Sequence, residues 1–267
     1  MRIPIECVHI NGFSMRYFRF GKGDRTLVIL PGLSVQSVMG LADAVAQSYA
    51  SLQDDFTIYV FDRREELPET YPVREMARDT AAVMQALGLR EVCLFGASQG
   101  GMMALVIAIE YPKLVAKLAL GSSSAHVQPE QYRVIEDWIR LAEAGDAVGL
   151  YLAFGREIYP PAVYEQYRAA LAAAGESVTA EELRRFCILA RGIKSFSAEE
   201  ELSAIRCPVF AIGDYEDAVL DSDATMEIAE KMDERAGFRL YMYVGFGHAA
   251  FDTAPDYRKR LLDFFLS

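Results

Sequence analysis

The chain has 267 residues, of which 52% are hydrophobic, and these numbers suit one large domain with a substantial core. Its formal net charge of −11 argues against nucleic acid or an anionic membrane surface as a partner. We expect a cytoplasmic protein, because the sequence shows no apolar run of membrane-spanning length, no signal-peptide pattern after Met1, and no CxxC among its widely spaced cysteines.

The first half of the chain alternates between predicted strands and helices. Residues 4–10 and 13–20 indicate two strands joined by Asn11-Gly12, a strong hairpin signal. Further apolar strands are predicted at 26–30, 56–61, 91–95 and 114–120, and helices at 36–50, 73–87 and 99–111. This alternation predicts an α/β fold with a mostly parallel sheet covered by helices on both faces.

From about residue 125 to residue 204 the pattern is helical throughout. Helices are predicted at 129–144, 146–155, 160–174 and 179–195, followed by a strand at 208–213, a helix at 222–233, a strand at 238–244 and a helix at 256–266. We therefore predict a core formed by 1–121 and 205–267, with 122–204 inserted as a helical cap, or lid. An independent helical domain is the alternative, but the strand–helix alternation resumes immediately after the insertion.

The most informative stretch lies between the predicted strand 91–95 and the helix 99–111. Gly96-x-Ser98-x-Gly100 in that context is the nucleophile-elbow pattern, in which a sharp turn exposes a serine at the sheet edge. The alternative is a glycine-rich turn that carries a solvated serine. A nucleophilic serine also needs a base, and histidine suits that role near neutral pH.

Three histidines are available as that base. His248 follows strand 238–244, so it is expected at the same carboxyl edge of the sheet as Ser98. His9 lies on the first hairpin, and His126 lies at the entry to the helical insertion. We therefore predict that His248 is the base.

Two further roles must be filled around Ser98 and His248. The loop after strand 208–213 offers four carboxylates that could orient the histidine, and position alone does not choose among them: Asp214, Glu216, Asp217 and Asp221. An oxyanion needs two backbone N–H donors, which would come from Gln99 after the serine and from Leu33 in the loop Pro31-Gly32-Leu33-Ser34.

Together these residues resemble the α/β-hydrolase superfamily, and specifically its lid-bearing, esterase- or lipase-like serine hydrolases. The resemblance covers nearly the whole chain and implies a mostly parallel eight-stranded sheet with the order Ser98…Asp217…His248. Within it, the Gly-x-x-Asp form of the acid loop selects Asp217, and Gly247-His248 with Pro255 matches the histidine loop.

The resemblance also has departures. Asp62-Arg63-Arg64 is similar to the family's structural Asp-x-Arg turn, but Glu65 follows where glycine is frequent. Pro31-Gly32 stands where many relatives have His-Gly. Serine at position 98 argues against the dehalogenase and epoxide-hydrolase branches, whose nucleophile is aspartate.

The resulting hypothesis is a serine hydrolase that cleaves a small carboxylic ester, lactone or thioester through an acyl-enzyme, with no metal and no organic cofactor. Activity should rise with pH through about 6.5, the ordinary pKa of imidazole. Aromatic residues of the insertion are candidate pocket walls, although aromatics at helical spacing more often belong to a core: Tyr132, Trp138 and Tyr159, with Tyr151 and Phe154.

Alternatives remain open at this point. An acyltransferase or a carbon–carbon bond hydrolase could use the same three residues, and a non-catalytic binding protein could retain the fold. The expected partner is a small acyl substrate, and the sequence does not predict an oligomeric state.

Overall fold

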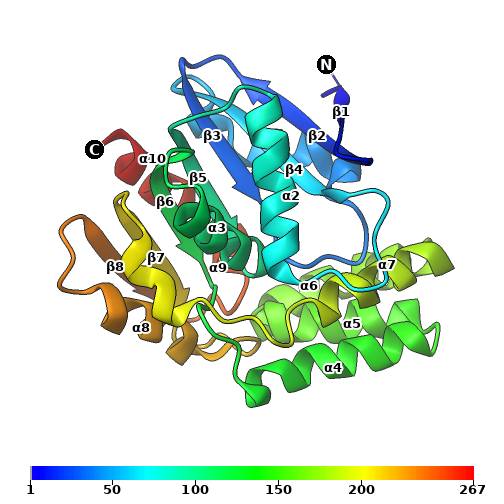
Figure 1. Ribbon diagram of the computed structural model, residues 1–267. Coiled ribbons are helices and arrows are strands. Elements are labelled where there is room, and N and C mark those ends of the chain that lie inside the picture. The colour runs from blue at the N-terminus through cyan, green and yellow to red at the C-terminus, as the bar shows by residue number, and fades with distance from the viewer. Residues whose placement is uncertain (1) are drawn as a thin grey trace.

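A computed structural model describes residues 2–267 (Figure 1). Its centre is one sheet with the strand order β1-β2-β4-β3-β5-β6-β7-β8. β1 and β2 form an antiparallel hairpin, β2 runs antiparallel to β4, and the other six strands are parallel to one another. The strands are β1 (Ile5–Ile10), β2 (Phe13–Gly21), β3 (Arg25–Leu30), β4 (Phe56–Arg64), β5 (Val92–Ala97), β6 (Val115–Gly121), β7 (Val209–Asp214) and β8 (Phe238–Tyr243). The predicted mostly parallel eight-stranded sheet is confirmed.

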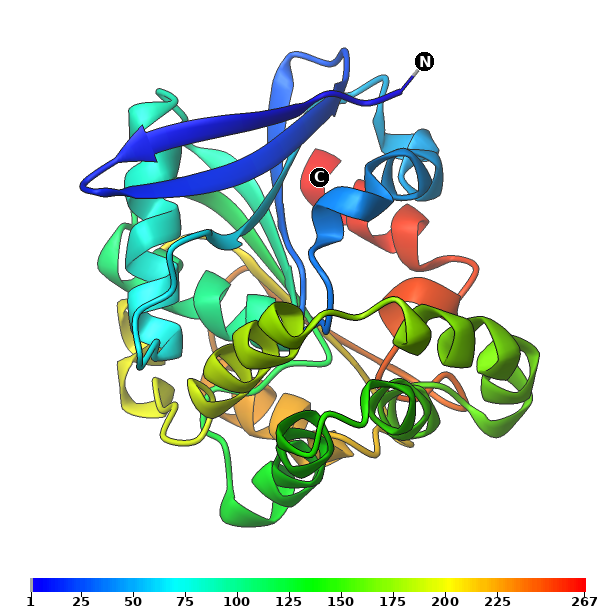
Figure 2. The same ribbon diagram turned by 90° about the vertical axis from the view of Figure 1, so that its right-hand side faces the viewer.

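Helices cover both faces of this sheet (Figure 2). One face carries α2 (Val73–Ala86), α3 (Gln99–Glu110) and α8 (Asp221–Met232), and the other carries α1 (Ala42–Ser48), α9 (Ala250–Thr253) and α10 (Tyr257–Leu266). Strand β5 is buried on both sides, since Val92 and Leu94 join one hydrophobic cluster while Cys93 and Phe95 join the other. This two-sided burial explains its continuous apolar sequence.

Three local differences separate the predicted elements from the observed ones. Residues 36–50 form no single helix but a 3₁₀ turn (Val38–Leu41), α1, and a second 3₁₀ turn (Ala50–Leu52). Gly40 weakens a continuous helix there, and the Ser37 hydroxyl caps the first turn by accepting a hydrogen bond from Met39 N at 3.2 Å. The second difference is that strand β4 continues to Arg64, because that residue pairs with Met15. The third is the presence of two short helices, α9 and Glu199–Ala204, which lack any strong sequence signal.

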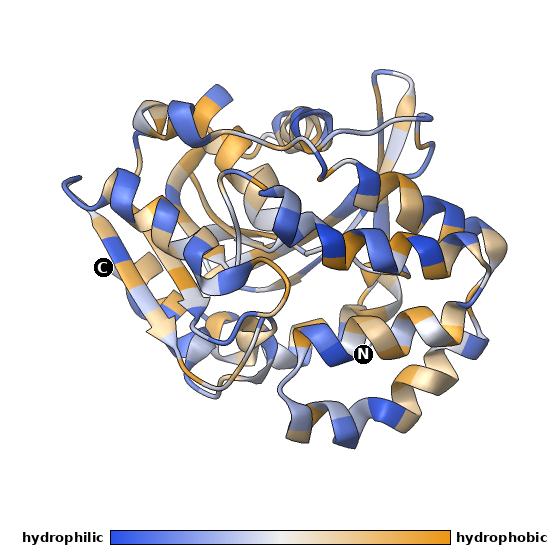
Figure 3. Ribbon diagram, turned by 90° about the horizontal axis from the view of Figure 1, so that it is seen from below, coloured by the Kyte–Doolittle hydropathy of each residue, from blue (hydrophilic) through white to orange (hydrophobic). Residues whose placement is uncertain are grey.

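Four helices stand between β6 and β7, where the sequence predicted them (Figure 1). They are α4 (Pro129–Glu143), α5 (Ala147–Ile158), α6 (Pro161–Glu176) and α7 (Ala180–Arg191). Their boundaries follow ordinary rules, since proline begins α4 and α6, and Thr179 forms a capping box with Glu182 at the start of α7. Hydrophilic and hydrophobic stretches alternate along these helices (Figure 3).

The two stretches that connect the inserted segment to the sheet pair with each other. His126 and Ser197 form an isolated antiparallel bridge. On either side of it, Val127 N donates to Phe196 O at 3.1 Å and Ala198 N donates to Ala125 O at 2.7 Å. The two ends of the insertion are thus held against each other beside the carboxyl edge of the sheet.

Candidate active site

Ser98 lies in the sharp turn between β5 and α3. Its φ of 52° and ψ of −123° place a non-glycine residue in a strained region of backbone space. The flanking glycines are required by close packing. A Cβ atom on Gly96 would lie 2.3 Å from the carbonyl oxygen of Gly100, and one on Gly100 would lie 2.0 Å from that of Leu30. The Gly-x-Ser-x-Gly pattern is therefore a packing requirement of this turn.

Neighbouring groups hold the strained backbone of Ser98 on both sides. Ser98 N donates to Gly121 O at 2.8 Å, and Ser98 O accepts from the Ser123 hydroxyl at 2.8 Å and from Gly101 N at 2.9 Å. Sequence reasoning did not identify Ser123. The only signal was its place in a serine run directly after the neighbouring parallel strand β6.

His248 pairs with Asp217 at the carboxyl ends of β7 and β8. Its Nδ1 lies 2.8 Å from Asp217 Oδ2 and 3.0 Å from Oδ1, and both residues are buried. Asp217 Oδ1 also accepts from the amides of Val219 and Leu220, at 2.8 and 3.1 Å. Because the carboxylate accepts the Nδ1 proton, the second ring nitrogen, Nε2, is the one available to take a proton.

The other three carboxylates of the acid loop have different environments. Asp214 is fully buried, and its two oxygens accept from Glu216 N at 2.7 Å and Phe246 N at 2.9 Å, so it ties the loops after β7 and β8 together. Glu216 and Asp221 are exposed. Asp217 is the one of the four that meets the histidine.

Ser98 and His248 line a common cavity of about 800 Å³. No hydrogen bond joins the Ser98 hydroxyl to His248 within residues 2–267; such serine–histidine contacts are often long without a substrate. Gly32 approaches the serine closely, because a Cβ on Gly32 would lie 3.2 Å from Ser98 Cβ. Leu33 follows it and lines the cavity, while Gln99 supplies the first amide of α3, which has no acceptor within the helix.

A buried arginine connects these two amide-bearing segments. Arg63 Nη2 donates to Gly32 O at 3.2 Å and to Gln99 Oε1 at 2.6 Å, and Gln99 Nε2 donates to Leu189 O at 2.7 Å. Burial lowers the pKa of Arg63 to about 10, and the negative charge of Asp62 opposes that shift. Sequence reasoning treated this turn as structural and did not foresee the contact with Gln99.

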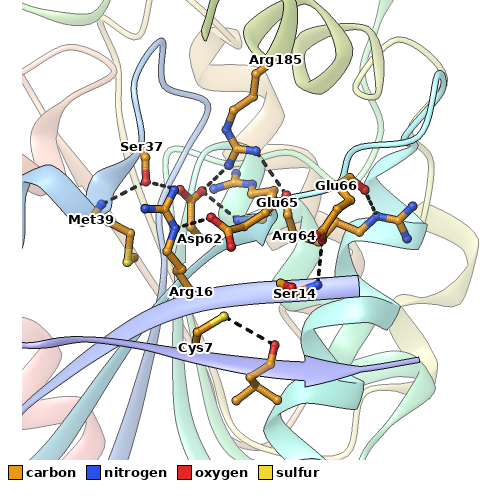
Figure 4. A network of polar contacts seen from close by, with 12 residues as sticks. Cys7, Ser14, Arg16, Ser37, Met39, Asp62, Arg64, Glu65, Glu66 and Arg185 are labelled. Carbon is orange, nitrogen blue, oxygen red and sulfur yellow. Dashed lines mark hydrogen bonds and ion pairs between the residues drawn. The ribbon is translucent and has the colours of Figure 1, made fainter. Parts of the chain in front are cut away.

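Asp62 is the anion of this arginine cluster. Its Oδ1 accepts from Arg63 N at 2.7 Å and from Arg185 Nη2 at 2.8 Å, and its Oδ2 accepts from the Ser37 hydroxyl at 2.5 Å. Figure 4 shows Arg185 reaching Asp62 from the inserted helix α7. The cluster thus links the insertion, the loop before α1 and the turn that carries Gly32.

The inserted helices form one wall of the cavity. Trp138 and Tyr159 line it, as do Tyr151 and Phe154. Tyr132 is buried outside the cavity lining, beneath the Lys194 ammonium at 5.3 Å from its ring centre. Trp138 lies six positions after Tyr132, a rotation of about 240° around a helix, so the two point to different sides of α4. The expectation that Tyr132 contacts substrate is therefore not supported by its position.

Residues 2–267 hold no cluster of three or more His, Cys, Asp or Glu residues arranged to bind a metal ion. Across the same residues, no helix is both long enough and apolar enough to cross a bilayer.

Comparisons with known proteins agree with this fold. Residues 25–146 match the family model described as the alpha/beta hydrolase fold. The chain is 29% identical to the serine hydrolase BPHL of Mus musculus over 138 residues, which is 48% of this chain and 46% of that protein. It is 26% identical to the putative carbamate hydrolase RutD of Agrobacterium fabrum over 251 residues, covering 90% of this chain and 93% of that one.

Solved structures extend the likeness to nearly every residue. The α/β hydrolase MGS-M2, from a Medee basin deep-sea metagenome, superposes with a TM-score of 0.86 at 19% identity and covers 98% of both chains. The enol-lactonase of Burkholderia xenovorans superposes with a TM-score of 0.83 at 18% identity, covering 98% of this chain and all of that one. At these identities the superpositions establish the fold.

Proposed function

Because the chain belongs to the α/β-hydrolase superfamily, we propose that it is a serine hydrolase that cleaves a small ester, lactone or thioester through an acyl-enzyme on Ser98. One observation carries the proposal. The strained Ser98 and the Asp217-paired His248 line the same cavity at the carboxyl edge of the sheet. A binding protein has no need of a strained serine and an oriented histidine together.

In the proposed reaction, Ser98 Oγ attacks the acyl carbon while His248 Nε2 takes the hydroxyl proton. Asp217 orients the imidazole and stabilises its positive charge, and the amides of Gln99 and Leu33 donate to the developing oxyanion. His248 then returns the proton to the leaving alcohol or thiol, which departs. Water, deprotonated by His248, then attacks the acyl carbon. The bond from that carbon to Ser98 Oγ breaks as His248 returns the proton to Oγ, which releases the acid and restores Ser98.

The surroundings favour a small and largely apolar acyl compound. Cavity walls such as Ile135, Trp138 and Phe154 are apolar, and hydrolysis of a carbamate, a lactone or an ester is named among the chain's relatives. We also propose that the inserted segment 122–204 is a lid over this cavity, since its helices supply one wall.

The decisive test is intact-mass labelling with a fluorophosphonate, which reacts only with an activated serine. We expect one adduct on the wild type and none on Ser98→Ala. Ser222→Ala, at a half-buried serine on α8, is the matched control and should label like the wild type. An adduct on Ser98→Ala would show that another serine is the nucleophile.

Two further outcomes separate the rival functions. A folded wild type that takes no label would favour the non-catalytic binding protein. If labelling succeeds, turnover of ester substrates in the presence of added alcohol or thiol follows. New esters or thioesters among the products would identify an acyltransferase, and free acid alone would identify a hydrolase.

A further inference from the structure

A second charged group borders the cavity that contains Ser98. Asp252 lies on α9, four residues after His248, and lines the cavity. Its side chain is 53% accessible, yet burial raises the pKa of its carboxyl group. The residue also lines the cavity, so part of its accessible surface faces the cavity. The Asp252 carboxylate is therefore presented to whatever occupies the cavity.

The protein leaves this carboxylate without a hydrogen-bond donor. Within residues 2–267, its nearest cation is Arg258, whose Nη2 lies 3.7 Å from Asp252 Oδ1, beyond hydrogen-bond distance. Arg258 Nη2 donates instead to the Ser48 hydroxyl at 2.7 Å, and the guanidinium lies 5.2 Å from the centre of the Tyr49 ring. A carboxylate can accept about four hydrogen bonds, so the capacity of Asp252 is unused.

The neighbours of Asp252 define which ligand group fits. Tyr49 and Tyr159 also line the cavity, and the pKa of each phenol is raised, first by burial and further by the negative charge of Asp252. Both phenols therefore stay neutral. A cationic ligand would be attracted by Asp252 but repelled by Arg258, and an anionic ligand would be repelled by the carboxylate it meets. A neutral hydroxyl donor satisfies Asp252 without adding charge.

We propose that Asp252 is a substrate-binding residue that accepts a hydrogen bond from a hydroxyl group of a neutral ester or lactone held at Ser98. The proposal rests on the function proposed for Ser98, and it narrows the substrate class to hydroxylated acyl compounds. The apolar walls contact the carbon skeleton, and Asp252 selects for the hydroxyl. The same compound without the hydroxyl should be a poorer substrate, because it leaves the Asp252 carboxylate without a hydrogen-bond donor.

The test compares kcat/KM for pairs of methyl esters whose acyl chains range from butyrate to octanoate. In each pair, the acyl chain of one ester ends in a methyl group and that of the other ends in a hydroxyl group. A second series of acetate esters places the same two end groups, methyl or hydroxyl, at the end of the alcohol portion. We expect the wild type to prefer the hydroxylated partner at one chain length by roughly ten- to hundredfold, which is the value of a hydrogen bond to a charged group. Because the readout is a ratio, a loss of folded protein cancels from it.

Two variants and a control locate the effect. Asp252→Asn should reduce the preference about tenfold, because a neutral acceptor replaces a charged one. Asp252→Leu should abolish it. Asp263→Asn, which makes the same chemical change on an exposed carboxylate of α10, should keep the wild-type ratio. A wild type without preference at any length, or a preference that both Asp252 variants retain, overturns the proposal.

A binding measurement keeps the subsite separate from the chemistry. Trp138 is the sole tryptophan of the chain and lines the cavity, so its fluorescence can report binding of unreactive ketones to Ser98→Ala. A hydroxyl-ended methyl ketone should bind more tightly than its methyl-ended partner, and Asp252→Leu in the same background should remove the difference. If Ser98→Ala still hydrolyses esters, the proposed function fails while this titration still decides the role of Asp252. Equal binding of the two ketones would count against the subsite.

Discussion

Two acid–arginine clusters flank the cavity, and they differ in how fully their carboxylate is hydrogen-bonded. Asp62 accepts three hydrogen bonds, from Arg63 N, Arg185 and Ser37. Asp252 accepts none from side chains or backbone within residues 2–267, and its arginine stands 3.7 Å away. A satisfied network fixes the groups around it, whereas an unsatisfied one retains capacity for a ligand. An aspartate beside an arginine can thus either fix the surrounding structure or bind a ligand.

Solvent access explains why the fold tolerates this difference. Asp62 is 6% exposed, and a charge buried to that degree must be paired because an unpaired one costs several kcal/mol. Asp252 borders a cavity of about 800 Å³, which is large enough to admit solvent or substrate. Its missing partners are therefore less costly than they would be inside packed protein.

The largest expected effect breaks the satisfied cluster. Asp62→Asn leaves Arg63 and Arg185 without their shared anion, so the free energy of unfolding should fall by about 3–5 kcal/mol. Asp252→Asn makes the same change at the cavity and should alter it by less than about 1 kcal/mol. Urea unfolding at neutral pH measures both. Equal losses would mean that the two clusters do not differ in the way their hydrogen bonds indicate.

The next effect is on rate and tests what the satisfied cluster supports. Arg63→Met keeps an unbranched side chain but removes the donor to Gly32 O and Gln99 Oε1. The amides of Leu33 and Gln99, which we propose as oxyanion donors, should lose their alignment, lowering kcat about ten- to hundredfold with little change in KM. Arg63→Lys retains a charged donor and should recover part of that loss. A rise in KM at constant kcat would instead assign Arg63 to substrate binding.

Much of the candidate site was predictable because backbone geometry dictates it. The turn at Ser98 accepts only glycine at its crowded positions, so its pattern is visible in the sequence. Parallel strands end at a common edge, and this placed the loops of Asp217 and His248 beside Ser98. Their hydrogen bond then follows from loop positions that the family resemblance had selected.

The remaining features depend on side-chain direction, which no local pattern records. Arg63 meets Gln99 from a different strand–loop junction, 36 positions away in the chain. The role proposed for Asp252 depends on a cavity assembled from segments across the whole chain, and α9 is too short for a periodic signal. Tyr132 was expected to line the cavity but does not, because the sequence does not tell which side of α4 faces the cavity.

A pH series sharpens the comparison at Asp252. Because burial raises the carboxyl pKa in the folded state, the folded protein binds this proton more tightly than the unfolded chain does. The contribution of Asp252 to stability is therefore complete below the ordinary value of 3.8 and is lost as pH rises through the raised pKa. Asn cannot titrate, so the unfolding free energy of the wild type should decline relative to that of Asp252→Asn across this window. A difference that is constant with pH, or that moves in the opposite direction, would contradict a raised pKa for Asp252.

The smallest expected effect concerns a neutral contact in the cavity wall. The Tyr151 hydroxyl donates to Gln36 Oε1 at 2.9 Å, and Gln36 Nε2 donates to Glu182 Oε1 at 3.1 Å, which joins the inserted helices to the loop before α1. Tyr151→Phe removes one partly buried hydrogen bond and should lower the unfolding free energy by about 1 kcal/mol, because water replaces the lost partner. Tyr167→Phe, at an exposed tyrosine of the insertion, should leave it unchanged. A neutral and satisfied contact should show neither the large destabilisation of Asp62→Asn nor the altered substrate preference of Asp252→Asn. If Tyr151→Phe changed that preference instead, the hydroxyl of the substrate would bind at the wall formed by the inserted helices, and Asp252 would lose its assigned role.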